Sequence, residues 1–421
     1  MTRDLPADIT GAFGAFVPPS YNRARTIHLR FIEETSRCRY RLVAWGPVFP
    51  EDGGGSYEGW LELDPQEVKS VCELLRSEWV RQIIHYEPEG EGCTWPFSEL
   101  WDLSDRPHLL ADKVVTLAEL GNTAFRRLFS GDPGIQQIRA ILEQALRSRE
   151  QVISFESENL CMPWGMIYTS PYTDHPRPTE EHWSYEGFWG YQHIIEHTFE
   201  RVIDFDPRIL IPDSGLTVGM NVDHRIDADY KDTLYIDRTI QFFRAQATVV
   251  VRSRKREVAK AFQDKNFADN ITFFGCHAQV SGEGGPLILP YLQLDQDDRI
   301  HGEEIKDWLQ DPGLATRPFV YIGACEGGQV GSTFYSDCGG ALLGKNGGRC
   351  LLGPQLPLPP GFAAEYSSLL FTEFTRPGTK LGDIVKDLTH KFIEDHENPL
   401  GLMFSLYRGI DVHLWPEGAK Q

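Results

Sequence analysis

Several features are missing from this chain, and each absence excludes a class of protein. No apolar run approaches the roughly 18 residues that a transmembrane helix needs, so we expect no membrane partner. The opening stretch, MTRDLPADITGAFG, contains acids and lacks the apolar core of a signal peptide, which predicts a cytoplasmic protein. Neither a P-loop nor a G-x-G-x-x-G after the first strand of a βαβ unit occurs, which argues against a nucleotide-binding α/β enzyme.

Basic residues and paired cysteines are also scarce. The 41 Lys and Arg residues face 61 Asp and Glu residues, a formal net charge of −20, so the chain is a poor candidate for direct nucleic-acid binding. Its 8 cysteines include no C-x-x-C pair, and we expect free thiols and no metal site. With 421 residues, of which 41% are hydrophobic, the chain is long and apolar enough for two or three folded domains.

The hydrophobic pattern changes character near residue 205. Before it, an alternating hairpin at 27–43 is followed by helical spacing at 66–86 and 107–148. After it, short apolar strands alternate with helices. Strands are predicted at 216–222, 247–251, 271–275, 319–323, 350–353 and 402–407, and helices at 232–245, 255–263, 302–310, 338–345, 361–375 and 380–394. We therefore predict an α/β fold with an N-terminal α+β half at 1–204 and, at 205–421, a mostly parallel sheet flanked by helices.

Two histidines, His193 and His197, stand four residues apart and could share a helix face. Such a pair binds zinc when a third ligand and a glutamate base accompany it, but the H-E-x-x-H order is absent. We interpret both as structural histidines.

A histidine and a cysteine follow two of the predicted parallel strands. His277 comes after the strand at 271–275, and Cys325 comes after the strand at 319–323. Ligands and catalytic groups gather at the carboxyl ends of such strands. Histidine is the usual partner that turns a cysteine into a thiolate nucleophile, and the glycines after Cys325 bring backbone amides near a substrate. Either residue alone would more often be structural, but the two together indicate a catalytic dyad.

Two other cysteines, Cys276 and Cys338, lie near the predicted site. Cys276 adjoins His277, and because neighbours on a strand face opposite ways, only one of the two can face the cleft. We assign the cleft to His277. Cys338 falls at a predicted helix start, where a thiol pKa can drop, but a chemical role for it is the weaker hypothesis.

These blocks resemble the CHAT family, the caspase- and separase-like cysteine peptidases of clan CD. The strands leading to His277 and to Cys325, the Ala324-Cys325-Glu326-Gly327 sequence and the 48-residue spacing (325 − 277 = 48) are similar to the catalytic blocks of that group. The further similar blocks are Met162-Pro163-Trp164, Phe188-Trp189-Gly190 and Asn398 to Gly409. The resemblance covers roughly residues 110–415. It implies a caspase-like catalytic half and a pseudo-caspase-like regulatory half before it.

The resemblance also implies roles for individual residues. Cys325 would attack the peptide carbonyl, His277 would move the proton, and the backbone amides of Ala278 and Cys325 would form the oxyanion hole. The family usually has glycine at the position of Ala278; alanine keeps the amide, provided the position does not need a positive φ. No metal or organic cofactor is expected.

The expected substrate pocket includes Glu326, Leu356, Pro357 and Leu358. Arginine-cleaving relatives carry an aspartate near the position of Pro357, and no acid stands there. We therefore expect a neutral residue before the cleaved bond, although Glu326, Asp295 or Asp337 could still reach the pocket.

The implied function is a protease (hydrolase) that cleaves a specific protein partner, such as a gasdermin-type protein, in prokaryotic antiviral defence. The alternative is a catalytically silent caspase-like adaptor or scaffold. Glycine-rich loops at 281–285 and 327–332 flank the two catalytic blocks, and ordering them costs entropy. We therefore expect a protein activator or an oligomeric assembly to switch the enzyme on.

Overall fold

The computed structural model describes residues 23–50, 56–89, 92–199, 206–230, 233–281, 289–310, 312–323 and 334–418. Cys325, its neighbours Ala324 and Glu326, and the loop at 327–332 lie outside these ranges, as do residues 282–285. Ser281, the first residue of the other loop, is the last residue of a described strand.

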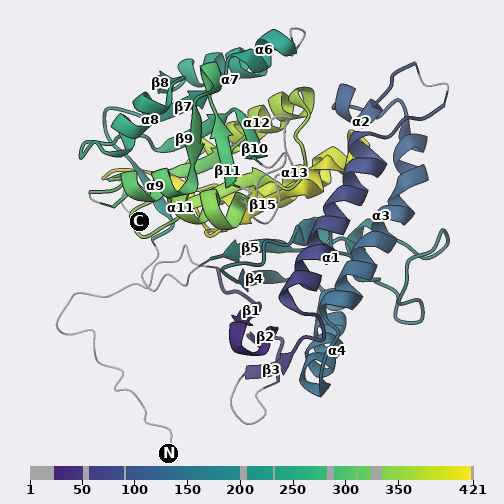
Figure 1. Ribbon diagram of the computed structural model, residues 1–421. Coiled ribbons are helices and arrows are strands. Elements are labelled where there is room, and N and C mark those ends of the chain that lie inside the picture. Colours follow the sequence, from purple (N-terminus) through teal and green to yellow (C-terminus); the bar gives the residue numbers. More distant parts are fainter. Residues whose placement is uncertain are drawn as a thin grey trace, which may run out of the picture.

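One 11-stranded sheet runs through the molecule (Figure 1). Its order is β3 (Ser56–Trp60), β2 (Arg39–Trp45), β1 (Ile27–Glu34), β4 (Val152–Glu156), β5 (Ile194–Thr198), β15 (Phe404–Tyr407), β14 (Cys350–Pro354), β13 (Phe319–Ile322), β9 (Ile271–Gly275), β7 (Thr217–Val222) and β8 (Thr248–Arg252). The pairs β3–β2, β2–β1 and β14–β15 are antiparallel and the others are parallel. The predicted mostly parallel α/β sheet is confirmed.

The sheet contains two blocks of strands that meet at one junction. Strands that precede residue 200 in the chain, β1 to β5, lie together, and the later strands form the remainder. The blocks join where β5 pairs in parallel with β15, with His197 opposite Tyr407. The expected boundary at 204/205 therefore falls between two blocks of a single continuous sheet.

Helices cover both blocks (Figure 1). The longer ones in the N-terminal block are α1 (Pro65–Trp79), α3 (Pro107–Leu128) and α4 (Pro133–Ser148). Those in the C-terminal block are α7 (Tyr235–Arg244), α8 (Lys255–Phe262), α9 (Gly302–Trp308), α12 (Pro360–Phe374) and α13 (Leu381–Glu394). The short ones are α2 (Pro96–Glu99), α5 (Trp189–Gln192), α6 (Arg225–Asp229) and α11 (Gly340–Leu342). At 335–342 a π-helical turn, η6 (Tyr335–Gly339), precedes α11 where the sequence predicted one helix over 338–345.

Two smaller sheets accompany the large one. β10 (His277–Ser281), β11 (Leu289–Gln293) and β12 (Arg299–His301) form an antiparallel three-stranded sheet. β6 (Arg208–Ile211) pairs with β16 (His413–Pro416). The first residue of this three-stranded sheet is His277, the histidine of the predicted dyad.

The central strands divide their side chains between two hydrophobic cores. Phe273 and Tyr321 belong to the core that also contains residues of α7 and α12, whereas Phe274 and Ile322 belong to a second core with residues of α8 and α9. This is the alternation that a strand imposes on neighbouring side chains. Because both faces are buried, β9 and β13 are continuous apolar runs, as in parallel sheets generally.

Candidate active site

Parallel strands of the C-terminal block end at a common edge of the sheet. The segments that follow them therefore begin near one another. In the pairing of β9 with β13, Phe274 lies opposite Ile322. The backbone amide of Gly323 then donates a 2.8 Å hydrogen bond to the carbonyl of Phe274. On the other side of β9, the amide of Asp223 donates to the carbonyl of Gly275 at 2.8 Å. The chain segments after β7, β9 and β13 therefore leave the sheet at the same level.

His277 stands just beyond this edge. It is the first residue of β10, pairs with Gln293 of β11, and is partly exposed. Ala278 follows it in the strand, opposite Leu292, with its side chain buried. Positive backbone φ values occur at other non-glycine residues of the described chain but not at Ala278, so alanine fits this position without strain.

Cys276 faces the opposite way from His277. Its side chain is fully buried in the same core as Phe274. Burial, with the nearby Asp223 carboxylate, raises the pKa of this thiol far above its ordinary value, and the backbone amide of Gln293 opposes the shift only in part. A thiol that stays protonated and enclosed is not a nucleophile. Cys276 is therefore assigned to packing, and the role of His277 stays a prediction.

Cys338 has a similar environment. It lies in η6, is fully buried, and its Sγ is 3.8 Å from the carbonyl oxygen of Pro290. Burial and the adjacent Asp337 carboxylate raise its pKa well above the ordinary value. Desolvation outweighs any effect of a helix start, and we assign Cys338 to packing.

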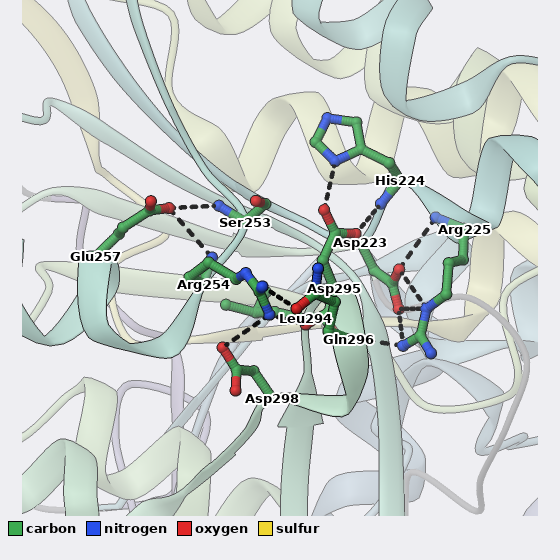
Figure 2. A network of polar contacts seen from close by, with 10 residues as sticks. All are labelled: Asp223, His224, Arg225, Ser253, Arg254, Glu257, Leu294, Asp295, Gln296 and Asp298. Carbon is green, nitrogen blue, oxygen red and sulfur yellow. Dashed lines mark hydrogen bonds and ion pairs between the residues drawn. The ribbon is translucent and has the colours of Figure 1, made fainter.

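A polar network fixes the sheet that carries His277 against the strand ends (Figure 2). After β7, the backbone amide and the Nδ1 atom of His224 contact the two carboxylate oxygens of Asp295 at 2.7 and 2.9 Å. Burial opposes ionisation of Asp295, but the contacts with His224 outweigh it and hold the pKa of Asp295 below its usual value. Asp295 begins the turn that connects β11 to β12, so this contact links that turn to β7.

The same turn is bound at further points. The Arg225 guanidinium contacts the fully buried Asp223 at 2.7 Å and Asp297 at 2.7 Å, and it donates to the carbonyl of Leu294. From the start of α8, the Lys255 amide donates to Asp298. Figure 2 shows Arg254 directed at Asp298 and the carbonyl of Asp295. The turn includes Gln296 at φ 58° and Asp297 at φ 61°, a conformation that costs on the order of 1 kcal/mol per residue and that these contacts offset.

These contacts position His277 indirectly. The bound turn holds β11, β11 pairs with β10, and His277 is placed opposite Gln293 by that pairing. Sequence reasoning missed His224, Arg225 and Asp295 as positioning residues. The available signal was that His224 and Arg225 follow a buried parallel strand, as His277 does.

The expected pocket residues lie after β14. Leu356 and Leu358 are buried in the large hydrophobic core, while Pro357 between them is partly exposed. Of these three side chains, that of Pro357 is the one that is accessible from the surface. The fourth expected pocket residue, Glu326, lies outside the described residues. Asp295 is held by His224, and Asp337 lies 3.6 Å from Lys306, so both carboxylates already have cationic or hydrogen-bonding partners.

An arginine of the N-terminal block contacts Gln355, the residue just before the expected pocket segment. Arg76 of α1 is 5% exposed and donates to the side-chain oxygen of Gln355 at 2.6 Å and to the carbonyl of Cys161. Gln355 directly follows β14, and its amide nitrogen donates to the hydroxyl of Tyr407 at 2.8 Å. The two blocks are therefore joined by a buried polar chain beside the expected pocket. No sequence pattern pointed to Arg76.

The paired histidines are structural. His193 ends the short α5 and His197 lies in β5, so they do not share a helix as the sequence suggested. Burial lowers the pKa of His193 to about 3 and that of His197 to about 4. Within the described ranges, no group of three or more His, Cys, Asp or Glu residues is arranged to hold a metal ion, and no helix is long and apolar enough to cross a membrane.

Comparison with known proteins gives distant relatives. No family model matches the sequence. A protein of Vitiosangium sp. described as a probable protease is 23% identical over 247 residues, which cover 56% of this chain and 31% of that protein. Two structures of the Saccharomyces cerevisiae separase–securin complex align with 91% and 93% of this chain and 30% of theirs, with TM-scores of 0.42 and 0.43 and 10% identity. The chain is thus similar in sequence to a probable protease over about half of its own length, and it spans about a third of that relative.

Proposed function

We propose that this chain is a cysteine endopeptidase with Cys325 and His277 as its catalytic dyad. The observation that carries the proposal is the register of β9 and β13, in which Phe274 lies opposite Ile322. His277 and Cys325 each stand three residues beyond these partners in the sequence (277 − 274 = 3 and 325 − 322 = 3). Segments that leave one sheet edge at the same level suit the hydrogen-bond reach that a dyad requires.

The distant relative supports the same class of reaction. A protein described as a probable protease is similar to 56% of this chain. Because this chain spans only 31% of that relative, we assign peptide hydrolysis to this chain only as a proposal.

The proposed reaction proceeds in two steps. His277 accepts the thiol proton of Cys325, and the sulfur attacks the carbonyl carbon of the scissile bond. The amides of Ala278 and Cys325 donate to the oxyanion of the tetrahedral intermediate. The C–N bond breaks as His277 gives its proton to the leaving amine. Water, deprotonated by His277, then attacks the thioester, and the thiol regains its proton as the acid product leaves.

The substrate we propose is a specific protein partner with a neutral residue before the scissile bond. The partly exposed Pro357 and the apolar segment around it support a neutral preference, with Glu326 at the pocket as the expected polar contact. The family resemblance implies a role in prokaryotic defence against viruses, with a gasdermin-type or other companion protein as the substrate.

Residues 1–204 are proposed as a regulatory half and residues 205–421 as the catalytic half. The buried contact of Arg76 with Gln355 supports communication between them, because it joins α1 to the residue that begins the pocket segment. An activator that moves α1 would move this contact. We propose that such a partner, or an oligomeric assembly, orders the loops at 281–285 and 327–332.

Labelling with an electrophilic peptide probe tests the assignment. The purified chain is treated with acyloxymethyl ketone probes that carry different neutral residues, with and without its candidate partner, and the adduct is located by mass spectrometry. Rapid labelling at Cys325 that is lost in His277→Gln supports the dyad. Labelling at another cysteine, or slow labelling unaffected by His277→Gln under all conditions, would identify a silent adaptor instead.

A further inference from the structure

A cavity of about 700 Å³ lies in the N-terminal block, away from the residues of the candidate active site. One wall is the C-terminal half of α3, with Glu119, Thr123, Arg126 and Arg127. Arg177 and Thr179, from the long segment between β4 and β5, also line it. This volume is within the range of roughly 300–1,000 Å³ typical of small-molecule sites.

Three arginines line this cavity. Within the described part of the molecule, Arg126, Arg127 and Arg177 form no ion pair, although acidic residues outnumber basic ones by 20 in the whole sequence (61 − 41 = 20). The nearby Arg139 is paired with Glu143 at 2.9 Å. Partial burial and the charges of Arg139 and Arg177 lower the pKa of Arg126, which means that its positive charge is destabilised there. An anion in the cavity would relieve this repulsion.

Helix polarity explains part of the arrangement but not all of it. Arg126 and Arg127 are in the last turn of α3, where cations interact favourably with free carbonyl groups. Arg177 belongs to a different segment and has no such role, yet it lines the same cavity. Three guanidinium groups from two segments therefore surround one space.

Two carboxylates line the cavity together with the arginines, and they limit which ligands would fit. Glu119 lines the cavity on α3, seven residues before Arg126 and so on the same helix face. Glu62 also lines it but accepts a hydrogen bond from Ser130. The exposed Glu119 carboxylate would repel a bare anion, whereas a ligand with hydroxyl or amino groups near its anionic end could contact both Glu119 and the arginines.

We propose that this cavity binds a small phosphorylated molecule of about nucleotide size. Guanidinium forks match the oxygens of a di- or triphosphate, and Arg126, Arg127 and Arg177 supply three of them. Glu119 accepts from a hydroxyl or amino group of the remaining part, and Thr123 and Thr179 add hydroxyl groups at the rim. The site lies within residues 1–204, so it is a ligand site separate from the proposed dyad and does not depend on it.

Binding to the full chain is measured by calorimetry and thermal shift with inorganic pyrophosphate, ATP and GTP as probes. We expect at least one nucleotide to bind more tightly than pyrophosphate, and added salt to weaken both. Arg126→Gln and Arg177→Gln are each expected to weaken binding by about tenfold or more. The matched control is Arg244→Gln, which removes an exposed arginine from the last turn of α7 and should leave affinity unchanged.

Glu119→Gln tests the contact with the non-phosphate part of the ligand separately from the contacts with the phosphates. It should weaken nucleotide binding but leave pyrophosphate binding equal or stronger, because one negative charge is removed. The proposal is overturned if none of the three probes binds, if Arg244→Gln weakens binding as much as the cavity variants, or if an acidic peptide binds where the phosphates do not. Each result is independent of whether the chain cleaves peptides.

Discussion

Gly323 donates its backbone hydrogen bond to the carbonyl of Phe274, at the level where β9 and β13 end. The residues before this point alternate between two packed cores, so the strand ends are held on both faces. The sheet below this edge therefore provides a packed platform for the segments that follow the strands.

The first prediction concerns the dyad. Cys325→Ala and His277→Ala should each reduce cleavage of a protein substrate by several orders of magnitude while the circular dichroism spectrum stays unchanged, because the two act as one unit. Cys276→Ala should keep its activity and lose about 1–2 kcal/mol of stability, since it removes a buried sulfur. Cleavage assays and urea unfolding check both. A Cys325→Ala protein that still cleaves would overturn the dyad.

The second prediction concerns Arg76. Arg76→Met should lower the free energy of unfolding by about 2–4 kcal/mol, because Gln355 and the Cys161 carbonyl lose their buried donor. The matched control is Arg81→Met in the next turn, where the arginine side chain is 65% exposed and pairs with Glu78. That change should cost under about 1 kcal/mol. Equal losses in urea unfolding would show that Arg76 contributes no more than a surface residue.

The third prediction is a loss of stability in mild acid from His193 and His197. Both have folded-state pKa values, about 3 and about 4, below the ordinary 6.5. As the pH falls, these histidines become protonated in the unfolded chain before they do in the folded protein. Their contribution to the free energy of unfolding is therefore complete above pH 6.5 and is lost as the pH falls towards 4. At pH 5 the loss is at most about 2 kcal/mol per histidine.

Variants that cannot titrate isolate this effect. The Nε2 atom of His197 lies 3.0 Å from the Ser157 carbonyl, and glutamine can place a donor there. His197→Gln should make stability fall less steeply between pH 6.5 and 4.5 than in the parent chain. Parallel curves in denaturant titrations at each pH would show that His197 does not contribute.

The fourth prediction concerns Arg25. Its guanidinium contacts Glu196 at 2.7 Å and Asp411 at 2.6 Å, and both carboxylates are buried. Burial opposes ionisation of Glu196, yet Arg25 and the amides of Gly409 and Ile410 together hold its pKa below the usual value. Arg25→Met should cost about 3–5 kcal/mol, because it leaves buried carboxylates without their main partner.

Arg23 provides the comparison for Arg25. It pairs with Asp383, whose side chain is 40% exposed, so Arg23→Met should cost under about 1 kcal/mol. Thermal and urea unfolding of the two variants measure the difference. A cost for Arg25→Met as small as that for Arg23→Met would contradict this account of the buried cluster.

The sequence predicted most strands and helices because their periodicity is local. The hairpin at 27–43, the strands of the C-terminal block and the helices α12 and α13 appear as expected. Strand order is a long-range property, so the place of β15 between β5 and β14 had no local signal. The spacing of His193 and His197 would also fit one helix face, but His197 lies in β5, which pairs with β4 and β15, so tertiary pairing decides the local structure.

The site was predictable only in part for the same reason. His277 could be found because it directly follows an apolar strand, and the burial of Cys276 follows from strand alternation. The contacts of His224 with Asp295 and of Arg76 with Gln355 join residues 71 and 279 positions apart in the chain. Such pairs depend on how the segments pack, and residue types alone do not specify them.

The central place of β15 has a consequence for how the protein is made. This strand follows every other strand of the large sheet in the chain, yet it joins the two blocks in the middle. During synthesis, the edge of β5 therefore stays without its partner strand β15 until residue 407 has left the ribosome. The ion pair of Arg25 with Asp411 likewise cannot form until Asp411 has been translated. The peptidase we propose would therefore stay unassembled, and harmless to its own cell, until the segment that contains β15 and Asp411 has been translated.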